Sequence, residues 1–122
     1  MKAILRQVRI SPKKANLVAA LVRTKKTKEA LDILKFTPKK SAPILKKLIE
    51  SAIANAEKKD NLYIKEIIVN EGPTYKRSLP ISRGRTHPVL KRTSHIRVEL
   101  AQASETPKPK AEKPEPDKTK TN

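Results

Sequence analysis

The chain has 122 residues, of which 29 are Lys or Arg and 12 are Asp or Glu, so its formal net charge is +17. This excess of cations indicates a polyanionic partner, because the release of condensed counterions drives basic proteins onto nucleic acid. A chain of this length supports one domain with a small core rather than a deep catalytic pocket, and the absence of cysteine excludes disulfides and thiolate metal sites.

The first segment predicts a strand followed by a helix. Residues 3–10 are typical of a short extended segment, with Ile4, Val8 and Ile10 expected on one face. Ser11-Pro12 is a helix start signal, because Ser is a favoured N-cap and Pro suits the first helical position. Apolar residues at helical spacing then extend the helix to about Arg23.

Two further helices are predicted before the chain returns to strands. Thr27 is expected to cap a short helix that ends near Phe36. Regular helix is expected to resume near Ser41 rather than at Pro38, because a start at Pro38 would place Pro43 one turn inside the helix. The strongest periodic pattern in the chain follows, at Leu45, Leu48, Ile49, Ala52, Ile53 and Ala56.

The second half predicts strands. Residues 62–70 are rich in β-branched side chains, and residues 96–100 alternate apolar and charged side chains, which is typical of a strand with one buried face. The predicted class is therefore α+β, with three helices packed on one face of a small antiparallel sheet.

A basic arm is predicted between these last two strands. The 27 residues between Glu71 and Glu99 contain seven cations and no acid. An unstructured loop of this length is unusual in a compact domain, so we expect a two-stranded arm over residues 73–97 that turns near residues 82–85. Gly84 supplies a positive φ for the turn. Because an isolated two-stranded ribbon is only marginally stable in water, we expect the arm to be held among negatively charged groups.

A composition change near residue 102 marks the end of the predicted domain, residues 1–101. Residues 102–122 contain four of the ten prolines and very few apolar side chains. Their five Lys and four acids add only +1. We expect a disordered tail that contributes little to polyanion binding.

Several strings together resemble a known family. LVAALVRTKKTKEALDIL, LIESAIANAEKKD, NEGP and LKRTSHIRVEL occur in order and with the expected spacing over about residues 3–100. They resemble the family of the large-subunit ribosomal protein numbered twenty-two, in its bacterial form. The resemblance implies a structural protein of cytoplasmic ribosomes that binds large-subunit ribosomal RNA in several of its domains and supports early subunit assembly. It further implies a β-hairpin that lines the peptide exit tunnel, with neighbouring ribosomal proteins and the nascent peptide as further partners.

The charge pattern and the resemblance give one set of candidate residues. Candidate RNA contacts are Arg6, Ser11, Lys13, Lys14, Lys25, Lys26, Lys76, Arg77, Arg83, Gly84, Arg85, Lys91, Arg92, Thr93, Ser94 and His95. The resemblance implies a tunnel-lining arm tip made of Leu79, Pro80, Ile81, Ser82, Arg83, Gly84, Arg85 and Thr86. Ile81-Ser82 and His87-Pro88 depart from the family pattern at this tip.

One alternative to the ribosomal hypothesis remains open. A DNA-architectural protein would lay such an arm in a groove and insert Pro80 or Pro88 between base steps. Proteins of that kind normally present two arms from a dimer. A preference for structured ribosomal RNA over duplex DNA would separate the two hypotheses.

Other function classes are disfavoured. Catalysis by His87 and His95 is not expected, because eight residues of extended strand separate them by roughly 26 Å. The acids have no His or Cys companions at metal-ligand spacing, so we expect neither a metal nor a cofactor. No apolar run approaches the roughly 20 residues that span a bilayer, and we expect no membrane partner.

Overall fold

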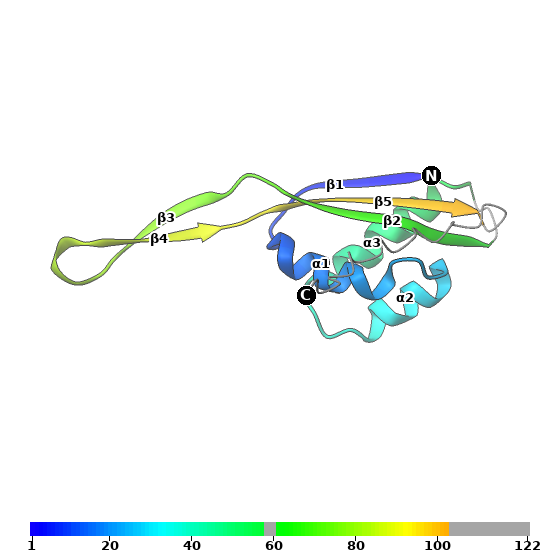
Figure 1. The fold of residues 1–122 in the computed structure, drawn as a ribbon, viewed down its shortest axis with the longest axis horizontal. Coiled ribbons are helices and arrows are strands. Elements are labelled where there is room, and N and C mark those ends of the chain that lie inside the picture. Colours follow the sequence, from blue (N-terminus) through cyan, green and yellow to red (C-terminus); the bar gives the residue numbers. More distant parts are fainter. Residues whose placement is uncertain (58–60, 103–122) are drawn as a thin grey trace, which may run out of the picture.

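The computed structural model describes residues 1–57 and 61–102, which form five strands and three α-helices. The elements in chain order are β1 (Lys2–Val8), α1 (Pro12–Val22), α2 (Thr27–Phe36), α3 (Ser41–Ala54), β2 (Leu62–Glu71), β3 (Tyr75–Pro80), a 3-10 turn (Ser82–Gly84), β4 (Thr86–Lys91) and β5 (Ser94–Gln102). An antiparallel sheet has the order β1-β5-β2, and β3 and β4 form a separate two-stranded hairpin (Figure 1). The predicted α+β class is confirmed.

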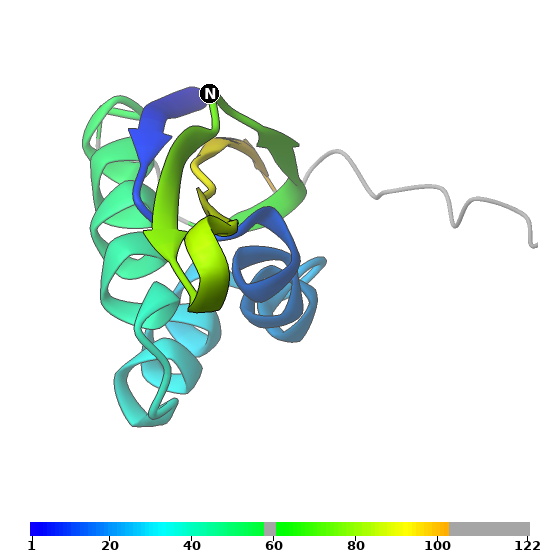
Figure 2. The same cartoon turned by 90° about the vertical axis from the view of Figure 1, so that its left-hand side faces the viewer.

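The three helices cover one face of the sheet and leave the other face open (Figure 2). Alternation along β5 explains this arrangement: Ile96, Val98 and Leu100 are buried, whereas the residues between them are partly exposed. The buried face packs against the apolar side of α3, where Leu45 and Ile49 are fully buried. Burial of these side chains is the main favourable contribution to folding.

The structure corrects the predicted face of β1. Ile4 is 55% exposed on the open face, whereas Ala3 faces the core. A register shift lies between Leu5 and Val8, and Gln7 within it has a φ of 54°. This bulge turns the chain by one residue, so that Val8 packs toward the core although Ile4 does not.

The helix starts agree with the prediction in position but not in every contact. Ser11 precedes α1 and its carbonyl accepts a hydrogen bond from the N–H of Ala15, but its side chain makes no capping bond. Thr27 was expected to be a cap, yet it is the first residue of α2 and its Oγ1 donates to the carbonyl of Leu62 at 3.1 Å. This hydrogen bond fastens α2 to β2, so the prediction of a Thr27 cap is wrong.

The third helix begins at Ser41, as predicted. Pro43 lies in its first turn, where a backbone N–H would have no partner within the helix. The helix ends at Ala54, two residues before the end of the apolar pattern, and Ala56 is nevertheless buried.

The hairpin projects away from the helices and the central sheet (Figure 1). Its register runs from Tyr75 opposite Lys91 to Pro80 opposite Thr86, and every residue of β3 and β4 is exposed. The predicted arm, residues 73–97, is too long at its C-terminal end. Ser94–Arg97 belong to β5 and pair with β2 in the central sheet.

The predicted tail, residues 102–122, lies outside the described residues except for Gln102. Gln102 ends β5 and pairs with Leu62. The predicted tail therefore begins one residue too early.

Candidate nucleic-acid interface

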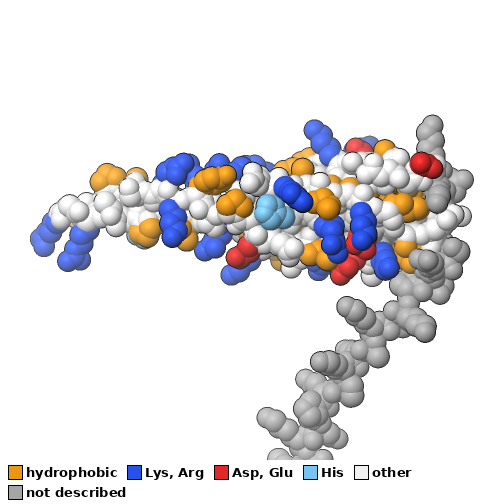
Figure 3. Space-filling view, turned by 90° about the horizontal axis from the view of Figure 1, so that it is seen from above, with side chains coloured by type: hydrophobic (Ala, Val, Ile, Leu, Met, Phe, Trp, Pro, Cys, Tyr) orange, Lys and Arg blue, Asp and Glu red, His pale blue; other side chains and the backbone are white. Residues whose placement is uncertain are grey.

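The hairpin presents positive charge without any compensating acid. Residues 75–91 contain Lys76, Arg77, Arg83, Arg85 and Lys91 and no Asp or Glu. All five side chains are exposed, and none forms an ion pair within residues 1–57 and 61–102. Basic side chains line the hairpin when the molecule is viewed onto the open face of the sheet (Figure 3). The hairpin is thus a solvent-exposed cationic surface along its whole length.

The tip of the hairpin holds an arginine in an unfavourable backbone conformation. The N–H of Ile81 donates to the carbonyl of Arg85 at 2.9 Å and closes the turn. Gly84 has the positive φ that was predicted, 72°, but Arg83 also lies in the left-handed region, with a φ of 59°. For a residue with a Cβ this conformation costs roughly 1–2 kcal/mol relative to the right-handed region. This backbone strain at the exposed tip makes Arg83 a candidate for a functional contact.

Apolar side chains flank the cations at the tip. Leu79 and Ile81 each expose more than half of their surface. Exposed apolar groups beside guanidinium groups suit contact with the faces of unstacked bases and with sugars, as well as with phosphates. The tip therefore offers both charged and apolar contacts.

The junction between the hairpin and the sheet is tightly packed. Thr93 is 1% exposed and its Oγ1 donates to the carbonyl of Pro73 at 2.6 Å, while the N–H of Gly72 donates to the carbonyl of Thr93 at 2.9 Å. Ser94 is fully buried, and its Oγ has no hydrogen-bond partner among the described residues. The predicted contacts of Thr93 and Ser94 with RNA are therefore wrong, because neither side chain reaches the surface.

A cation–π contact also joins the globular part to the base of the hairpin. The guanidinium of Arg9 lies over the ring of Tyr75, 5.4 Å from its centroid. Arg9 lies just after β1 and Tyr75 is the first residue of β3. The contact strengthens the connection made by Thr93 and Gly72, so several interactions set the direction of the hairpin before any partner binds.

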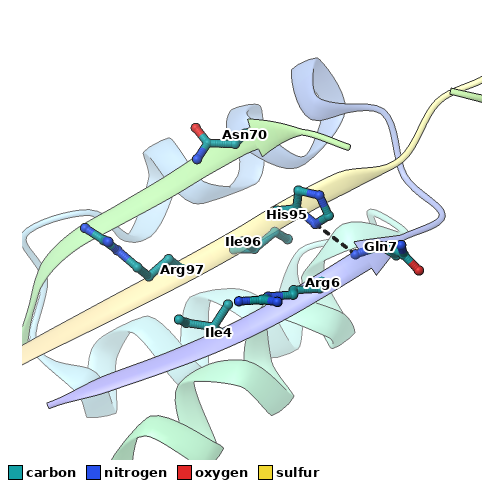
Figure 4. Close-up of a pocket in the computed structure, with 7 residues that line it drawn as sticks. All are labelled: Ile4, Arg6, Gln7, Asn70, His95, Ile96 and Arg97. Carbon is teal, nitrogen blue, oxygen red and sulfur yellow. Dashed lines mark hydrogen bonds between the residues drawn. The ribbon is translucent and has the colours of Figure 1, made fainter. Parts of the chain in front are cut away.

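His95 lies on the open face of the sheet, in a shallow depression between the outward-facing side chains of the three strands (Figure 4). Its Nδ1 accepts a hydrogen bond from the backbone N–H of Gln7 at 3.0 Å. This bond places the ring proton on Nε2, which remains available as a donor. The exposed Arg6 lies on the neighbouring strand in the same depression (Figure 4).

Farther along the same face, one carboxylate is shared by two cations. Glu99 lies 3.2 Å from both the Lys2 Nζ and the Arg97 Nη2. The hydrogen bond from Lys2 is the main cause that lowers the pKa of Glu99, and Arg97 adds to it through its charge. These cations are partly neutralised within the protein, unlike those of the hairpin.

The lysines predicted around the first helix lie in two separate places. Lys13 and Lys14 are exposed at the start of α1, toward the base of the hairpin, whereas Lys25 and Lys26 are exposed in the connection to α2 (Figure 1). The carbonyl of Lys25 accepts a hydrogen bond from the N–H of Ile64, which fixes this connection against β2. The two pairs cannot act as one cluster.

Comparison with known proteins shows which family the chain matches. Residues 3–101 match the family described as ribosomal protein L22p/L17e. The chain belongs to this family. It is 51% identical, over 83% of its length and 96% of the relative, to the large ribosomal subunit protein uL22 of Solidesulfovibrio magneticus. It is 48% identical to the uL22 proteins of Lactobacillus delbrueckii subsp. bulgaricus and Lawsonia intracellularis, each over 85% of its own length and 93% and 97% of theirs. The family predicted from the sequence strings is confirmed.

The fold also brings together basic residues that were not predicted from the sequence. Arg9, Lys39 and Lys40 did not belong to the predicted set, yet the fold gathers them beside Ser11 and Lys14. No local sequence signal links them, because residues from two helix starts meet only in the folded chain.

Membrane-spanning segments were also considered. Among the described residues, none of the helices combines the length and the apolar character that crossing a bilayer requires.

Proposed function

We propose that the chain is a structural constituent of the large ribosomal subunit and that it binds large-subunit ribosomal RNA. The observation that carries this proposal is the exposed hairpin, whose residues 75–91 contain five cations and no acid. The relatives described above are named as large-subunit proteins, which supports the same role. No step of this function requires catalysis by the chain.

The hairpin recognises RNA by charge and shape. Arg77, Arg83 and Arg85 bind phosphates through planar guanidinium groups, which can contact two oxygens at once. Leu79 and Ile81 pack against sugars or base faces. This mode suits folded RNA, whose narrow major groove hides its base edges from side chains.

The hairpin is inserted between RNA segments in this proposal and lines the peptide exit tunnel with residues 79–86. The nascent peptide passes the tip, and neighbouring ribosomal proteins contact the globular part. Because its contacts join distant RNA segments, the protein acts early in assembly of the subunit. The place of action is the ribosome in the cytoplasm.

The alternative of a DNA-architectural protein has lost its support. The relatives described above are all ribosomal proteins. Pro80 and Pro88, which suggested wedges between base steps, instead lie in the paired strands of the hairpin, where Pro80 is opposite Thr86 and Pro88 is opposite Ser78.

Co-sedimentation through a high-salt gradient tests the proposed function. The full chain is expected to stay with large ribosomal subunits at salt concentrations that remove loosely bound basic proteins. The matched variant replaces residues 78–88 by Asn-Gly, which joins the paired residues Arg77 and Val89 by a two-residue turn. It is expected to fold and to be washed off. Loss of the full chain from the subunits, or equal retention of the two proteins, would contradict the proposal.

A further inference from the structure

A depression on the globular part brings together the starts of two helices that lie far apart in the sequence. It lies where the first turn of α1 meets the connection between α2 and α3. Its polar lining consists of Arg9, Ser11, Lys14, Lys39, Lys40 and Ser41. Of these six residues, only Ser11 and Lys14 were predicted from the sequence as RNA contacts.

The lining carries four cations and no acid. Arg9, Lys14, Lys39 and Lys40 have no carboxylate within salt-bridge distance among residues 1–57 and 61–102. Four like charges around one depression repel one another, and the chain supplies no anion to offset them. An external anion in the depression would relieve this repulsion.

Hydrogen-bond donors converge on the same place. Ser41 is only 4% exposed, yet it lines the depression and its hydroxyl has no hydrogen-bond partner among the described residues. Ser11 makes no side-chain cap at the start of α1, and α3 likewise begins without a side-chain cap. Residues from the starts of both helices, which have 11 and 14 residues, line the same depression, so the positive ends of two helix dipoles lie near it.

We propose that this depression binds a phosphodiester of the RNA backbone, at a site on the globular part that lies near the base of the hairpin and away from its tip. Donors at helix starts together with cations form an anion site. The depression has a volume of about 550 Å³, and Leu17 on its wall is 72% exposed. Both features favour a nucleotide over free phosphate, because the apolar wall accommodates a sugar or a base face. The inference rests on the proposed function and adds a second point of attachment to it.

Two double variants with the same change in charge test the inference. Lys39→Gln/Lys40→Gln removes two cations from the depression, and Lys28→Gln/Lys47→Gln removes two exposed cations that do not line it. Affinity for deproteinised large-subunit ribosomal RNA is measured over a series of salt concentrations. Each lost phosphate contact lowers the slope of log K against log salt by about 0.7–0.9, which corresponds to roughly five- to eightfold at 0.1 M salt. The first variant is expected to show this loss, and the control to stay within about twofold of the unmodified chain.

The outcomes separate this inference from the proposed function. If the unmodified chain does not prefer ribosomal RNA to duplex DNA, the proposed function fails. If it does, but the two double variants lose the same affinity and the same slope, only the site at the depression is refuted.

A nuclear magnetic resonance titration with a uridine tetranucleotide gives a local readout. The amides of Lys14 and Ser41 are expected to shift together, and Ser41→Ala is expected to weaken this response about two- to tenfold, the range for one lost hydrogen bond. Shifts confined to the hairpin, or an unchanged response in Ser41→Ala, would overturn the proposal.

Discussion

Gly72→Ala is expected to destabilise the junction between the hairpin and the central sheet. A Cβ at residue 72 would lie 2.5 Å from the Thr93 Oγ1 and 3.3 Å from the His95 Nε2. Thr93 is 1% exposed and its hydroxyl is bonded to the carbonyl of Pro73, so it has no room to move aside. The substitution must shift the backbone or break this hydrogen bond.

The size of the effect follows from three contributions. Overpacking of a buried site costs about 1–3 kcal/mol, and the loss of the Thr93 hydrogen bond costs about 0.5–1.5 kcal/mol. The lower entropy of the unfolded alanine variant offsets about 0.4–1 kcal/mol. The net destabilisation therefore lies between about 0.5 and 4 kcal/mol, with a central value of about 2 kcal/mol. For a domain of this size it lowers the melting temperature by roughly 5–20 °C.

Thermal unfolding by circular dichroism measures this effect, with Gly84→Ala as the matched control. A Cβ at residue 84 meets no atom within 4 Å, and residue 84 lies at the tip of the exposed hairpin. Its positive φ strains only the local turn, so the melting temperature of the globular part is expected to change little. An equal melting temperature for Gly72→Ala and the unmodified chain would refute the packing argument.

A double-mutant cycle tests the proposed cause directly. Thr93→Ala removes the atom that the new Cβ would meet, so the effects of Gly72→Ala and Thr93→Ala are expected to be strongly non-additive. The double variant should be little less stable than Thr93→Ala alone. Additive effects would show that the two residues do not interact in this way.

Three further predictions concern charge. Arg83→Ala/Arg85→Ala is expected to leave the melting temperature unchanged, because both side chains are exposed, while salt-dependent RNA affinity falls by roughly five- to eightfold per lost contact at 0.1 M salt; a large drop in melting temperature would contradict this. The hydrogen bond from Lys2 holds the pKa of Glu99 below its usual value of 4.5. The chain is therefore expected to lose stability as the pH falls below about 5. Glu99→Gln should flatten this decline when the melting temperature is measured over a series of acid pH values. Deletion of residues 103–122 removes a net charge of only +1, so RNA affinity measured by filter binding should hardly change.

Local patterns predicted most of the elements. The apolar repeat of residues 45–56 and the alternation of residues 96–100 each describe a face that packs against the core, and both faces are buried as expected. The hairpin was predicted from its charge and length, because a run of cations without acids has no place in a small core. These features depend mainly on neighbours in the sequence.

The failed predictions depend on contacts between distant residues. The bulge at Gln7 reverses the face of Ile4, and nothing in the sequence marks this position, because glutamine is not a residue type that favours a positive φ. Thr93 and Ser94 are polar and follow a basic run, yet pairing with Pro73 and with β2 buries them. Sequence proximity to the arm was thus a poor guide to exposure.

The candidate site was likewise only partly visible in the sequence. Lys14 was predicted as an isolated contact near a helix start, whereas Lys39 and Lys40 were not considered. The fold brings these lysines together at one depression, a relationship set by the packing of α1 against the α2–α3 connection. Arg9 was missed for the same reason, since its partner Tyr75 is far away in the sequence.

The proposed role of the chain depends on a hairpin that protrudes from the globular part and inserts into ribosomal RNA. Cryo-electron microscopy of large subunits reconstituted with the full chain tests it most directly. Density for residues 75–91 is expected between RNA segments, with Arg83 and Arg85 next to phosphates. Density for the globular part bound to the subunit, with the hairpin folded onto its own sheet or helices, would contradict it.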